Sequence, residues 1–383
     1  MKKTETVARG LDTTYPSWKV EKLAVRKFSP ESFLAILDGI IERCPNVLAS
    51  RELGRSFEGR PIRSISAGAG GTKVLLWSQM HGDESTATMA IADILNYFAL
   101  HPDDGPAQVI RSSLHLLFLP MLNPDGAARF QRRTAQHIDM NRDALALQTP
   151  EARILKNLHE ELKPDFGFNL HDQELSTVGT SKNLTAIALL APATNGKKSD
   201  NQIHRRAKHL AAFLVESINL IFPHKVARYD DTFELRAFGD NMQRWGTSTL
   251  LIESGHIFND PEKQFIRRLN AVGILAGLHA IATGEYARAD VSLYESLPFN
   301  GKQAYDLLIR NIRVQHSNGE LIKADLGISY QVDTHTEETP VLADIGDLHT
   351  FVGLREIDGG ETALPERSLL LGKPFPWPKF FPQ

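Results

Sequence analysis

His81 and Glu84 are separated by two residues, a spacing at which an imidazole nitrogen and a carboxylate oxygen can bind the same metal ion. The same His-x-x-Glu spacing recurs at His171 and at His335, so spacing alone does not identify a site. Context separates the three pairs. His81 and His171 each follow a short apolar run typical of a buried strand, whereas His335 lies in a charged stretch that is expected to be a solvated loop. His81, Glu84 and His171 are therefore the candidate metal ligands.

The cysteine count narrows the chemistry of such a site. The chain has 14 histidines but a single cysteine, Cys44, which excludes an intramolecular disulfide and a thiolate-rich zinc site. Any metal would be held by nitrogen and oxygen atoms. Two histidines and one carboxylate leave one coordination position open, which is typical of catalytic zinc rather than structural zinc. For His81 taken alone, the alternative is a strand-end histidine whose ring is satisfied by the backbone.

Glu253 and three arginines are further candidates for catalytic or substrate-binding residues. Glu253 follows three aliphatic residues, where a carboxylate is costly to bury unless a cation, a metal-bound water or a helix terminus lies nearby. A structural salt bridge explains it equally well. Arg132, Arg133 and Arg142 lie close together, and guanidinium groups suit the recognition of a carboxylate or of an oxyanion because they offer a fixed fork of donors. Their alternative role is a solvated basic loop.

These side chains need elements that bring them together. Four apolar runs predict strands, each followed directly by polar residues: 74–77, 114–119, 166–170 and 250–252. Segments with helical periodicity alternate with these runs over residues 30–283, which predicts an α/β domain with helices on both faces of a largely parallel sheet. Ligands bind at the carboxyl ends of the strands in such sheets, so the candidate residues are expected at one edge.

Three of the predicted helices begin with a proline in the first turn. They start at Ser29-Pro30, Thr149-Pro150 and Asp260-Pro261. Proline is well suited to this position because the first helical amide has no partner inside the helix.

The character of the chain changes after residue 283. Helical periodicity stops, and short alternating segments with an Asn318-Gly319 hairpin signal predict a β-rich region. We therefore expect an α/β domain over residues 1–283 and a β-rich, sandwich-like accessory domain over residues 284–383. Four prolines within 373–382 exclude regular helix there, so this stretch is expected to be an extended arm packed by its aromatic side chains, with a docking tail as the alternative.

Composition excludes several classes of protein. The 383 residues suggest two domains, and 43 basic residues against 46 acidic ones give no sign of a nucleic-acid partner or an anionic membrane surface. No run approaches the roughly 18 to 20 apolar residues of a membrane helix. The first residues lack the apolar stretch of a signal peptide, so a cytoplasmic location is expected. The oligomeric state is left open.

Five stretches of the chain resemble the zinc carboxypeptidase family of the carboxypeptidase A type, in the order that is typical of the family. The resemblance covers about residues 30–283. It implies a mixed, mostly parallel eight-stranded sheet between helices, with the active site at the edge of the sheet. The matching stretches are His81-Gly82-Asp83-Glu84, Asn123-Pro124-Asp125-Gly126, Arg132 with Asp139-Met140-Asn141-Arg142, Asn169-Leu170-His171 and Thr249-Leu250-Leu251-Ile252-Glu253.

The resemblance implies a role for each catalytic candidate. One zinc ion per chain would be bound by His81, Glu84 and His171. Glu253 would activate a water molecule together with the metal. Arg132 would polarise the scissile carbonyl.

The resemblance also implies substrate-binding residues. Asn141 and Arg142 would hold the free carboxylate of the substrate, and Asp139 would orient the first histidine ligand. Tyr229 lies where the family carries a tyrosine, but without the usual glycine-rich stretch after it. Asp240 resembles the floor of the specificity pocket, although a glycine precedes it. Asp143, where many members have asparagine, would add a like charge near the bound carboxylate.

Two activities fit these residues. The first is a metallocarboxypeptidase that removes carboxyl-terminal residues from peptides. The second is an N-acyl amino acid amidohydrolase of the aspartoacylase and succinylglutamate desuccinylase type, which shares the metal ligands, the Asn-Arg pair and the glutamate. The Asn-Pro-Asp-Gly turn and the long β-rich domain favour the peptidase. A third hypothesis, a binding protein without activity, is disfavoured because all the chemical residues are present together.

Overall fold

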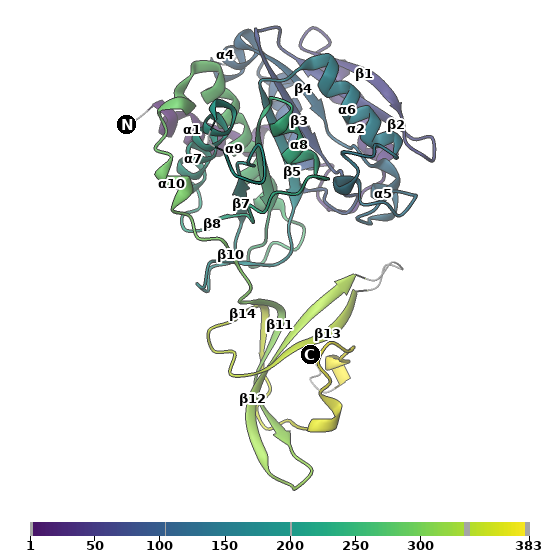
Figure 1. The fold of residues 1–383 in the computed structure, drawn as a ribbon, viewed down its shortest axis with the longest axis vertical. Coiled ribbons are helices and arrows are strands. Elements are labelled where there is room, and N and C mark those ends of the chain that lie inside the picture. The colour runs from purple at the N-terminus through teal and green to yellow at the C-terminus, as the bar shows by residue number, and fades with distance from the viewer. Residues whose placement is uncertain (1–2, 104, 200, 333–337, 380–383) are drawn as a thin grey trace. The chain divides into compact units, whose positions relative to one another are not determined.

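The computed structural model describes residues 3–103, 105–199, 201–332 and 338–379 of the chain (Figure 1). Its contacts divide the chain into two compact units. The first unit runs to Gln173 and resumes over Ala186–Phe299, and the second unit contains Glu174–Thr185 and the chain from Asn300 onward. The third histidine pair of the sequence, at His335, lies outside the described residues.

The first unit is built on an eight-stranded sheet in the order β1-β2-β4-β3-β5-β9-β7-β8. The four neighbouring strands β4, β3, β5 and β9 at its centre are parallel, as are β7 and β8, whereas the pairs β1-β2, β2-β4 and β9-β7 are antiparallel. The predicted mixed sheet is confirmed, with its parallel part concentrated at the centre. The strands are β1 (Leu48–Arg55), β2 (Pro61–Ala67), β3 (Thr72–Ser78), β4 (Leu114–Leu119), β5 (Phe166–Asp172), β7 (Ile187–Leu190), β8 (Val226–Arg228) and β9 (Ser248–Ser254).

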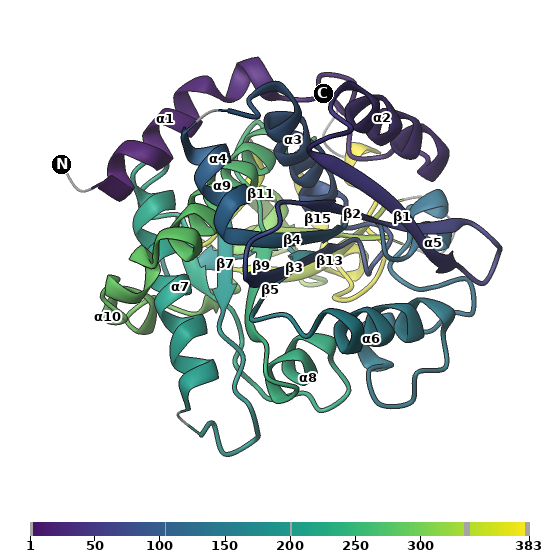
Figure 2. The same ribbon diagram turned by 90° about the horizontal axis from the view of Figure 1, so that it is seen from above.

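Helices cover both faces of this sheet, as the sequence predicts. Figure 2 shows α3, α4 and α9 on one side of the strands and α6 and α8 on the other. The helices of this unit are α1 (Lys3–Trp18), α2 (Pro30–Arg43), α3 (Thr86–Leu100), α4 (Gly105–Ser113), α5 (Pro124–Arg129), α6 (Pro150–Leu162), α7 (Gln202–Asn219), α8 (Phe238–Arg244) and α9 (Gln264–Thr283).

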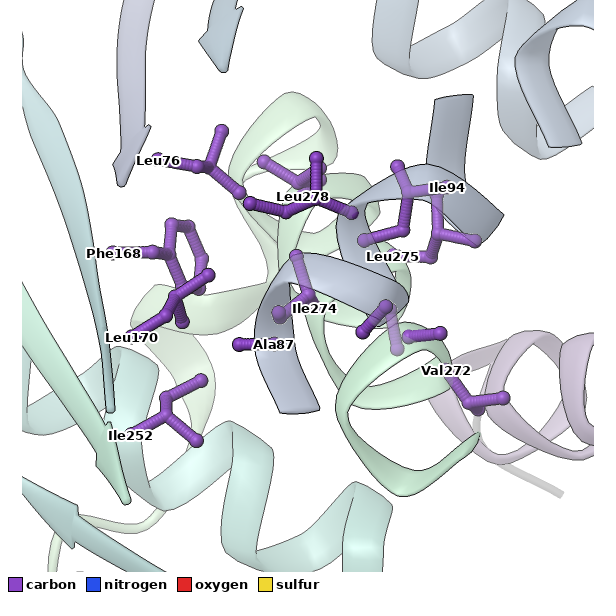
Figure 3. Packing of buried hydrophobic residues seen from close by; sticks show 14 of the residues in the cluster. Leu76, Ala87, Ile94, Phe168, Leu170, Ile252, Val272, Ile274, Leu275 and Leu278 are labelled. Atoms are coloured by element: carbon purple, nitrogen blue, oxygen red, sulfur yellow. The ribbon is translucent and has the colours of Figure 1, made fainter. Parts of the chain in front are cut away.

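Strand side chains alternate between the two cores. On β3, Val74 and Leu76 enter the core beneath α3 and α9, whereas Leu75 and Trp77 enter the core beneath α6 and α8. This alternation follows from the two-residue period of a strand. Figure 3 shows strand side chains facing helical ones in the first core: Leu76, Phe168, Leu170 and Ile252 against Ala87, Ile94, Ile274, Leu275 and Leu278.

The helix starts agree with the proline signals at two of three positions. Ser29 and Thr149 cap α2 and α6, and each side-chain oxygen accepts an amide hydrogen from the first turn. The helix predicted from Asp260-Pro261 instead begins at Gln264. Asp260 still acts as its cap from a distance, because its carboxylate accepts the amide hydrogens of the first three helical residues.

Helix α9 is the one described helix with the length and apolar character of a membrane span. Most of its residues are buried inside the first unit, where it packs against α1, α3 and α7. Its apolarity is accounted for by this central position, since a helix that is apolar on most sides belongs in a core.

The boundary between the units differs from the predicted position after residue 283. Residues 285–299 belong to the first unit. Tyr294, in the short helix α10 (Ser292–Glu295), is fully buried there, and its hydroxyl accepts the amide hydrogen of Ala191. Apolar burial rather than the end of helical periodicity therefore sets the limit of the unit.

The second unit is β-rich, as predicted, and is built on one main sheet. Five strands form it: β11 (Ala304–Gln315), β12 (Leu321–Val332), β13 (Glu338–Gly346), β14 (Val352–Asp358) and β15 (Ala363–Pro365). β6 (Thr177–Val178) and β10 (Asn300–Gly301) form a separate small ladder. Phe375 and Trp377 of the carboxyl-terminal arm join the core of the large sheet. The described part of the arm thus packs by these two aromatic side chains within its own unit, and Phe380 and Phe381 lie outside the described residues.

Candidate metal centre

His81 and Glu84 lie in the turn between β3 and α3, the strand-to-helix junction that the sequence predicts. Gly82 allows this turn to approach the first turn of α5. A Cβ atom on Gly82 would lie 2.0 Å from the backbone carbon of Gly126, so no larger residue fits there. The Asn-Pro-Asp-Gly turn therefore supports the candidate ligands by packing directly beneath them.

The structure brings the three predicted ligands together. Glu84 lies between the two histidines, with Oε1 at 2.8 Å from Nδ1 of His81 and Oε2 at 2.7 Å from Nδ1 of His171. One ligand atom from each of the three residues lies within 4.8 Å of the other two. All three side chains are buried. His81 and Glu84 follow the end of β3 and His171 lies near the end of β5, so the carboxyl ends of two strands build the cluster.

Asp139 holds the outer nitrogen of His81. Its Oδ1 lies 3.1 Å from Nε2 of His81, on the opposite side of the ring from Glu84. A proton on Nε2 shared with Asp139 leaves Nδ1 free to bind a cation, which is the tautomer that a metal ligand needs. Asp139 also begins the short turn Met140–Arg142, where its carboxylate accepts the amide hydrogen of Asn141.

Arg132 connects the two carboxylates of the cluster. Its guanidinium donates to Oε1 of Glu84 at 3.1 Å and to Oδ2 of Asp139 at 3.1 and 3.3 Å. Its side chain nevertheless remains about half exposed. The solvated-loop alternative does not apply to Arg132, but it does describe Arg133, whose guanidinium donates to the backbone carbonyl of His137 at the surface.

The pKa values of the three candidate ligands are set by burial and by the charges that these side chains and Asp139 place on one another. Burial lowers the pKa of His81, but Glu84 and Asp139 outweigh burial and raise it to about 9. Burial opposes ionisation of Glu84, yet the two histidines hold its pKa well below the usual range. For His171, burial prevails and lowers the pKa. The raised pKa of His81 therefore favours its protonated form at neutral pH in the absence of a metal ion.

Glu253 is the last but one residue of β9 and lies directly beside His171. The two strands are in parallel register, with His171 opposite Glu253. Glu253 forms no ion pair within the described residues, and its buried Oε2 has no hydrogen-bond partner there. Burial and the neighbouring Glu84 carboxylate raise its pKa well above the usual value. The salt-bridge alternative for Glu253 therefore has no support, and a proton-accepting role fits its surroundings.

Asn141 and Arg142 follow Asp139 toward the surface. Oδ1 of Asn141 accepts the amide hydrogen of Phe238 at 2.9 Å, which fixes the start of α8. Nε of Arg142 lies 3.4 Å from a carboxylate oxygen of Glu234, and Arg236 donates to the same oxygen at 2.8 Å. Glu234 thus occupies one side of the guanidinium of Arg142 in this structure.

Tyr229 and Asp240 are placed by their backbone positions, and no hydrogen bond to the candidate ligands is described for either side chain. Tyr229 follows β8, and its amide donates to the carbonyl of Leu189 in β7, which places its backbone at the edge of the sheet. Asp240 lies in the first turn of α8, where burial raises its pKa to about 7. Their roles in substrate binding stay predictions.

Asp143 is placed differently from the expectation that it adds charge to the carboxylate site. It is buried, and its two oxygens accept hydrogen bonds from the amides of Gln148 and Thr149 and from the hydroxyl of Thr149. Asp143 therefore organises the loop that leads into α6.

Sequence reasoning did not single out Asp172 or Lys263, although the side chains of both are buried near the cluster. Asp172 directly follows the candidate ligand His171, and this position next to a ligand could have identified it from the sequence. Lys263 carries no local signal, because only the fold brings it near Asp172. Burial lowers its pKa, and the Asp172 carboxylate opposes that effect.

Comparison with known proteins agrees with this geometry. Residues 33–182 match the family model of zinc carboxypeptidases. The matched range includes His81, Glu84, Arg132, Asp139 and His171. This part of the chain is similar to the zinc carboxypeptidase family.

The chain is similar to several known proteins. It is 29% identical over 143 residues to carboxypeptidase 2 of Trichophyton rubrum, which is 34% of this chain and 26% of that protein. The chain thus matches about a quarter of the length of that relative. Among solved structures, the metallo-carboxypeptidase of Burkholderia cenocepacia aligns with a TM-score of 0.54 at 19% identity, covering 68% of this chain and 70% of that one. Carboxypeptidase A of Helicoverpa armigera gives a TM-score of 0.54 at 16% identity, over 72% and 80% of the two chains. These two structures share the fold.

Proposed function

We propose that the chain is a zinc-dependent metallocarboxypeptidase that hydrolyses the carboxyl-terminal peptide bond of peptides, with one zinc ion per chain. The observation that carries the proposal is the convergence of His81, Glu84 and His171 beside Glu253, whose buried Oε2 has no hydrogen-bond partner among the described residues. The match of residues 33–182 to the zinc carboxypeptidase family supports the same activity.

The residues of the cluster fit a catalytic zinc ion. Two imidazole nitrogens and a carboxylate are ligands that zinc accepts, and three protein ligands leave a position for water or substrate. The contact between His81 and Asp139 fixes the ring in the orientation that ligation requires. Zinc, when bound, makes a water molecule acidic enough to act near neutral pH and polarises the substrate carbonyl.

Glu253 and Arg132 supply the remaining chemistry of hydrolysis. Glu253 takes the proton of the attacking water and then delivers it to the leaving amine, as a general base and then a general acid. Its raised pKa suits a group that must both accept and return a proton. The half-exposed Arg132 side chain meets the negative charge that develops on the carbonyl oxygen.

Arg142 and Asn141 select the chain end. A terminal carboxylate would pair with the guanidinium of Arg142 and displace Glu234, which holds that group in the free protein at 3.4 Å. The displaced Glu234 carboxylate keeps a cationic partner, because Arg236 donates to both of its oxygens. An exopeptidase needs such a group, since an internal peptide bond offers no carboxylate.

A panel of substrates tests the proposal. The zinc-loaded chain is expected to release free carboxyl-terminal amino acids from short peptides and to leave peptides with amidated ends intact. Glu253→Gln is expected to reduce kcat about 100- to 10,000-fold while zinc content stays at one per chain. Cleavage of N-acyl amino acids alone would replace the proposal with the amidohydrolase activity. Absence of zinc binding, measured by elemental analysis after loading, would overturn both.

A further inference from the structure

Lys263 is a fully buried cation next to the metal centre. Its side chain is 1% exposed, and it is the last residue before α9, with a left-handed backbone at φ 48°. Its Nζ donates to Oδ2 of Asp172 at 3.1 Å and to the backbone carbonyl of Ser254 at 3.1 Å. Burying an ammonium group costs free energy, so its position calls for a specific role.

The two partners of Lys263, Asp172 and Ser254, are the residues that follow His171 and Glu253 on the two strands. In the parallel ladder of β5 and β9, His171 is opposite Glu253, and the next rung pairs Asp172 with Ser254. One ammonium group therefore joins the ends of the two strands that present a metal ligand and the candidate general base.

Asp172 carries this connection into the ligand cluster. Its backbone amide donates to Oε2 of Glu84 at 3.2 Å, the oxygen that also contacts His171. Its side-chain Oδ2 accepts the hydroxyl of Thr86, in the first turn of α3, at 2.6 Å and lies 3.5 Å from the guanidinium of Arg26. Asp172 is thus fixed from three directions, and the Lys263 ammonium is its most deeply buried cation.

We propose that Lys263 is a positioning residue of the metal centre. Through Asp172 and Ser254 it holds the ends of β5 and β9 so that His171, Glu84 and Glu253 face one point. The expected effect of Lys263 on zinc binding is argued from these contacts alone. Its expected effect on turnover also rests on the proposed function. Partners of metal ligands typically contribute about 10- to 100-fold to metal affinity or activity.

Anchoring of α9 does not explain the burial of this ammonium group. The first amides of the helix are already accepted by the carboxylate of Asp260, at 2.6 Å for Gln264, 3.0 Å for Phe265 and 3.2 Å for Ile266. The Nζ of Lys263 instead points back to β5 and β9. A purely structural role predicts that its loss lowers the melting temperature and leaves zinc affinity and turnover unchanged.

The experiment compares Lys263→Met, which keeps the volume of the side chain but removes its charge, with Lys263→Arg, which keeps the charge. Lys208→Met is the matched control, because Lys208 forms a surface ion pair with Glu295 on α10. Zinc affinity is measured by competition with a chromogenic chelator, and kcat and KM are measured at saturating zinc. Lys263→Met is expected to raise the zinc Kd about 10- to 100-fold and to lower kcat by a similar factor, with KM within about twofold. Lys263→Arg is expected to recover most of both losses, and the control to match the native chain.

An unchanged zinc Kd and kcat in Lys263→Met overturns the inference, whatever happens to the melting temperature. If that variant does not fold, Asp172→Asn removes the charge that Lys263 pairs with and is expected to raise the zinc Kd about tenfold. An unchanged Kd there overturns the inference as well. A native chain that binds zinc but hydrolyses no peptide contradicts the proposed function, whereas the zinc measurement still decides the role of Lys263.

Discussion

The Glu84 carboxylate is shared among three positively charged or protonatable side chains. His81, His171 and Arg132 all contact it at hydrogen-bond distance. In the metal-free protein a proton on His81 neutralises part of the negative charge of Glu84 and Asp139. Zinc binding must displace that proton, because only a neutral imidazole has a lone pair to donate.

This exchange predicts proton release on zinc binding. The pKa of His81, raised to about 9, keeps the ring protonated at pH 7.5 in the metal-free chain. Zinc binding at that pH is therefore expected to release about one proton from His81, and zinc affinity is expected to fall about tenfold per pH unit below pH 9. Calorimetric titrations in buffers of different ionisation enthalpy measure the release. The Glu253→Gln variant isolates His81, since Glu253 can also lose a proton, and zinc binding without proton release in that variant would contradict the assignment.

Arg132 offers a second test at this scale. Arg132→Ala is expected to lower kcat about 100- to 1000-fold, because the developing oxyanion loses its cationic partner. The neighbouring Arg133→Ala serves as the control, because Arg133 donates only to the backbone of its own loop among the contacts described. Steady-state kinetics on one peptide compare the two. Equal activity of the two variants would remove Arg132 from the mechanism.

At the scale of elements, a buried ion pair ties the amino-terminal segment to the core. Asp93 of α3 and Arg267 of α9 are both 0% exposed and lie 2.6 Å apart. The carboxylate also accepts the hydroxyl of Tyr15 and the amide of Val20, and the guanidinium donates to the carbonyl of Val20. Helix α1 and the chain after it are therefore held by the same pair that joins α3 to α9.

Breaking this pair is expected to destabilise the first unit strongly. Arg267→Met leaves Asp93 buried without its cation and should cost about 3 to 5 kcal/mol in the free energy of unfolding. Arg268→Met removes the adjacent arginine, which pairs with Asp12 near the surface, and should cost under about 1 kcal/mol. Urea unfolding of both variants measures the difference. Similar losses in the two would show that the buried pair has no special role.

At the scale of the whole molecule, the two units have separate apolar cores. The core of the second unit contains the large sheet and the aromatic side chains of Phe375 and Trp377. The indole of Trp377 also donates to the hydroxyl of Tyr330 at 2.9 Å. All the predicted metal ligands and Glu253 belong to the first unit.

Separate cores predict separate responses to a core mutation. Trp377→Ala is expected to cost the second unit about 3 to 5 kcal/mol, because it leaves a large cavity beside the sheet. Hydrogen exchange is expected to accelerate in β11 and β12 and to remain unchanged in β3 and β5. Zinc affinity should equal that of the native chain. Accelerated exchange in β3 would show instead that the two units unfold together.

The sequence by itself determined the identity of the candidate metal ligands and the type of fold that carries them. His81, Glu84 and His171 could be selected because strand-end position and apolar periodicity are local properties of the chain. The α/β pattern and two proline-marked helix starts are local in the same way. The start of α9 was predicted too early, since Asp260 caps that helix from four residues before it begins.

Only the tertiary structure decided which charges meet. Lys263 and Asp172 are 91 residues apart, and Arg142 and Glu234 likewise come from distant segments. The loop-organising role of Asp143 and the limit of the first unit at Phe299 also depend on burial that no local pattern records. The physical reason is common to all of these: pairing and burial of charges are set by the packing of strands and helices against one another, whereas a motif reports only neighbours along the chain.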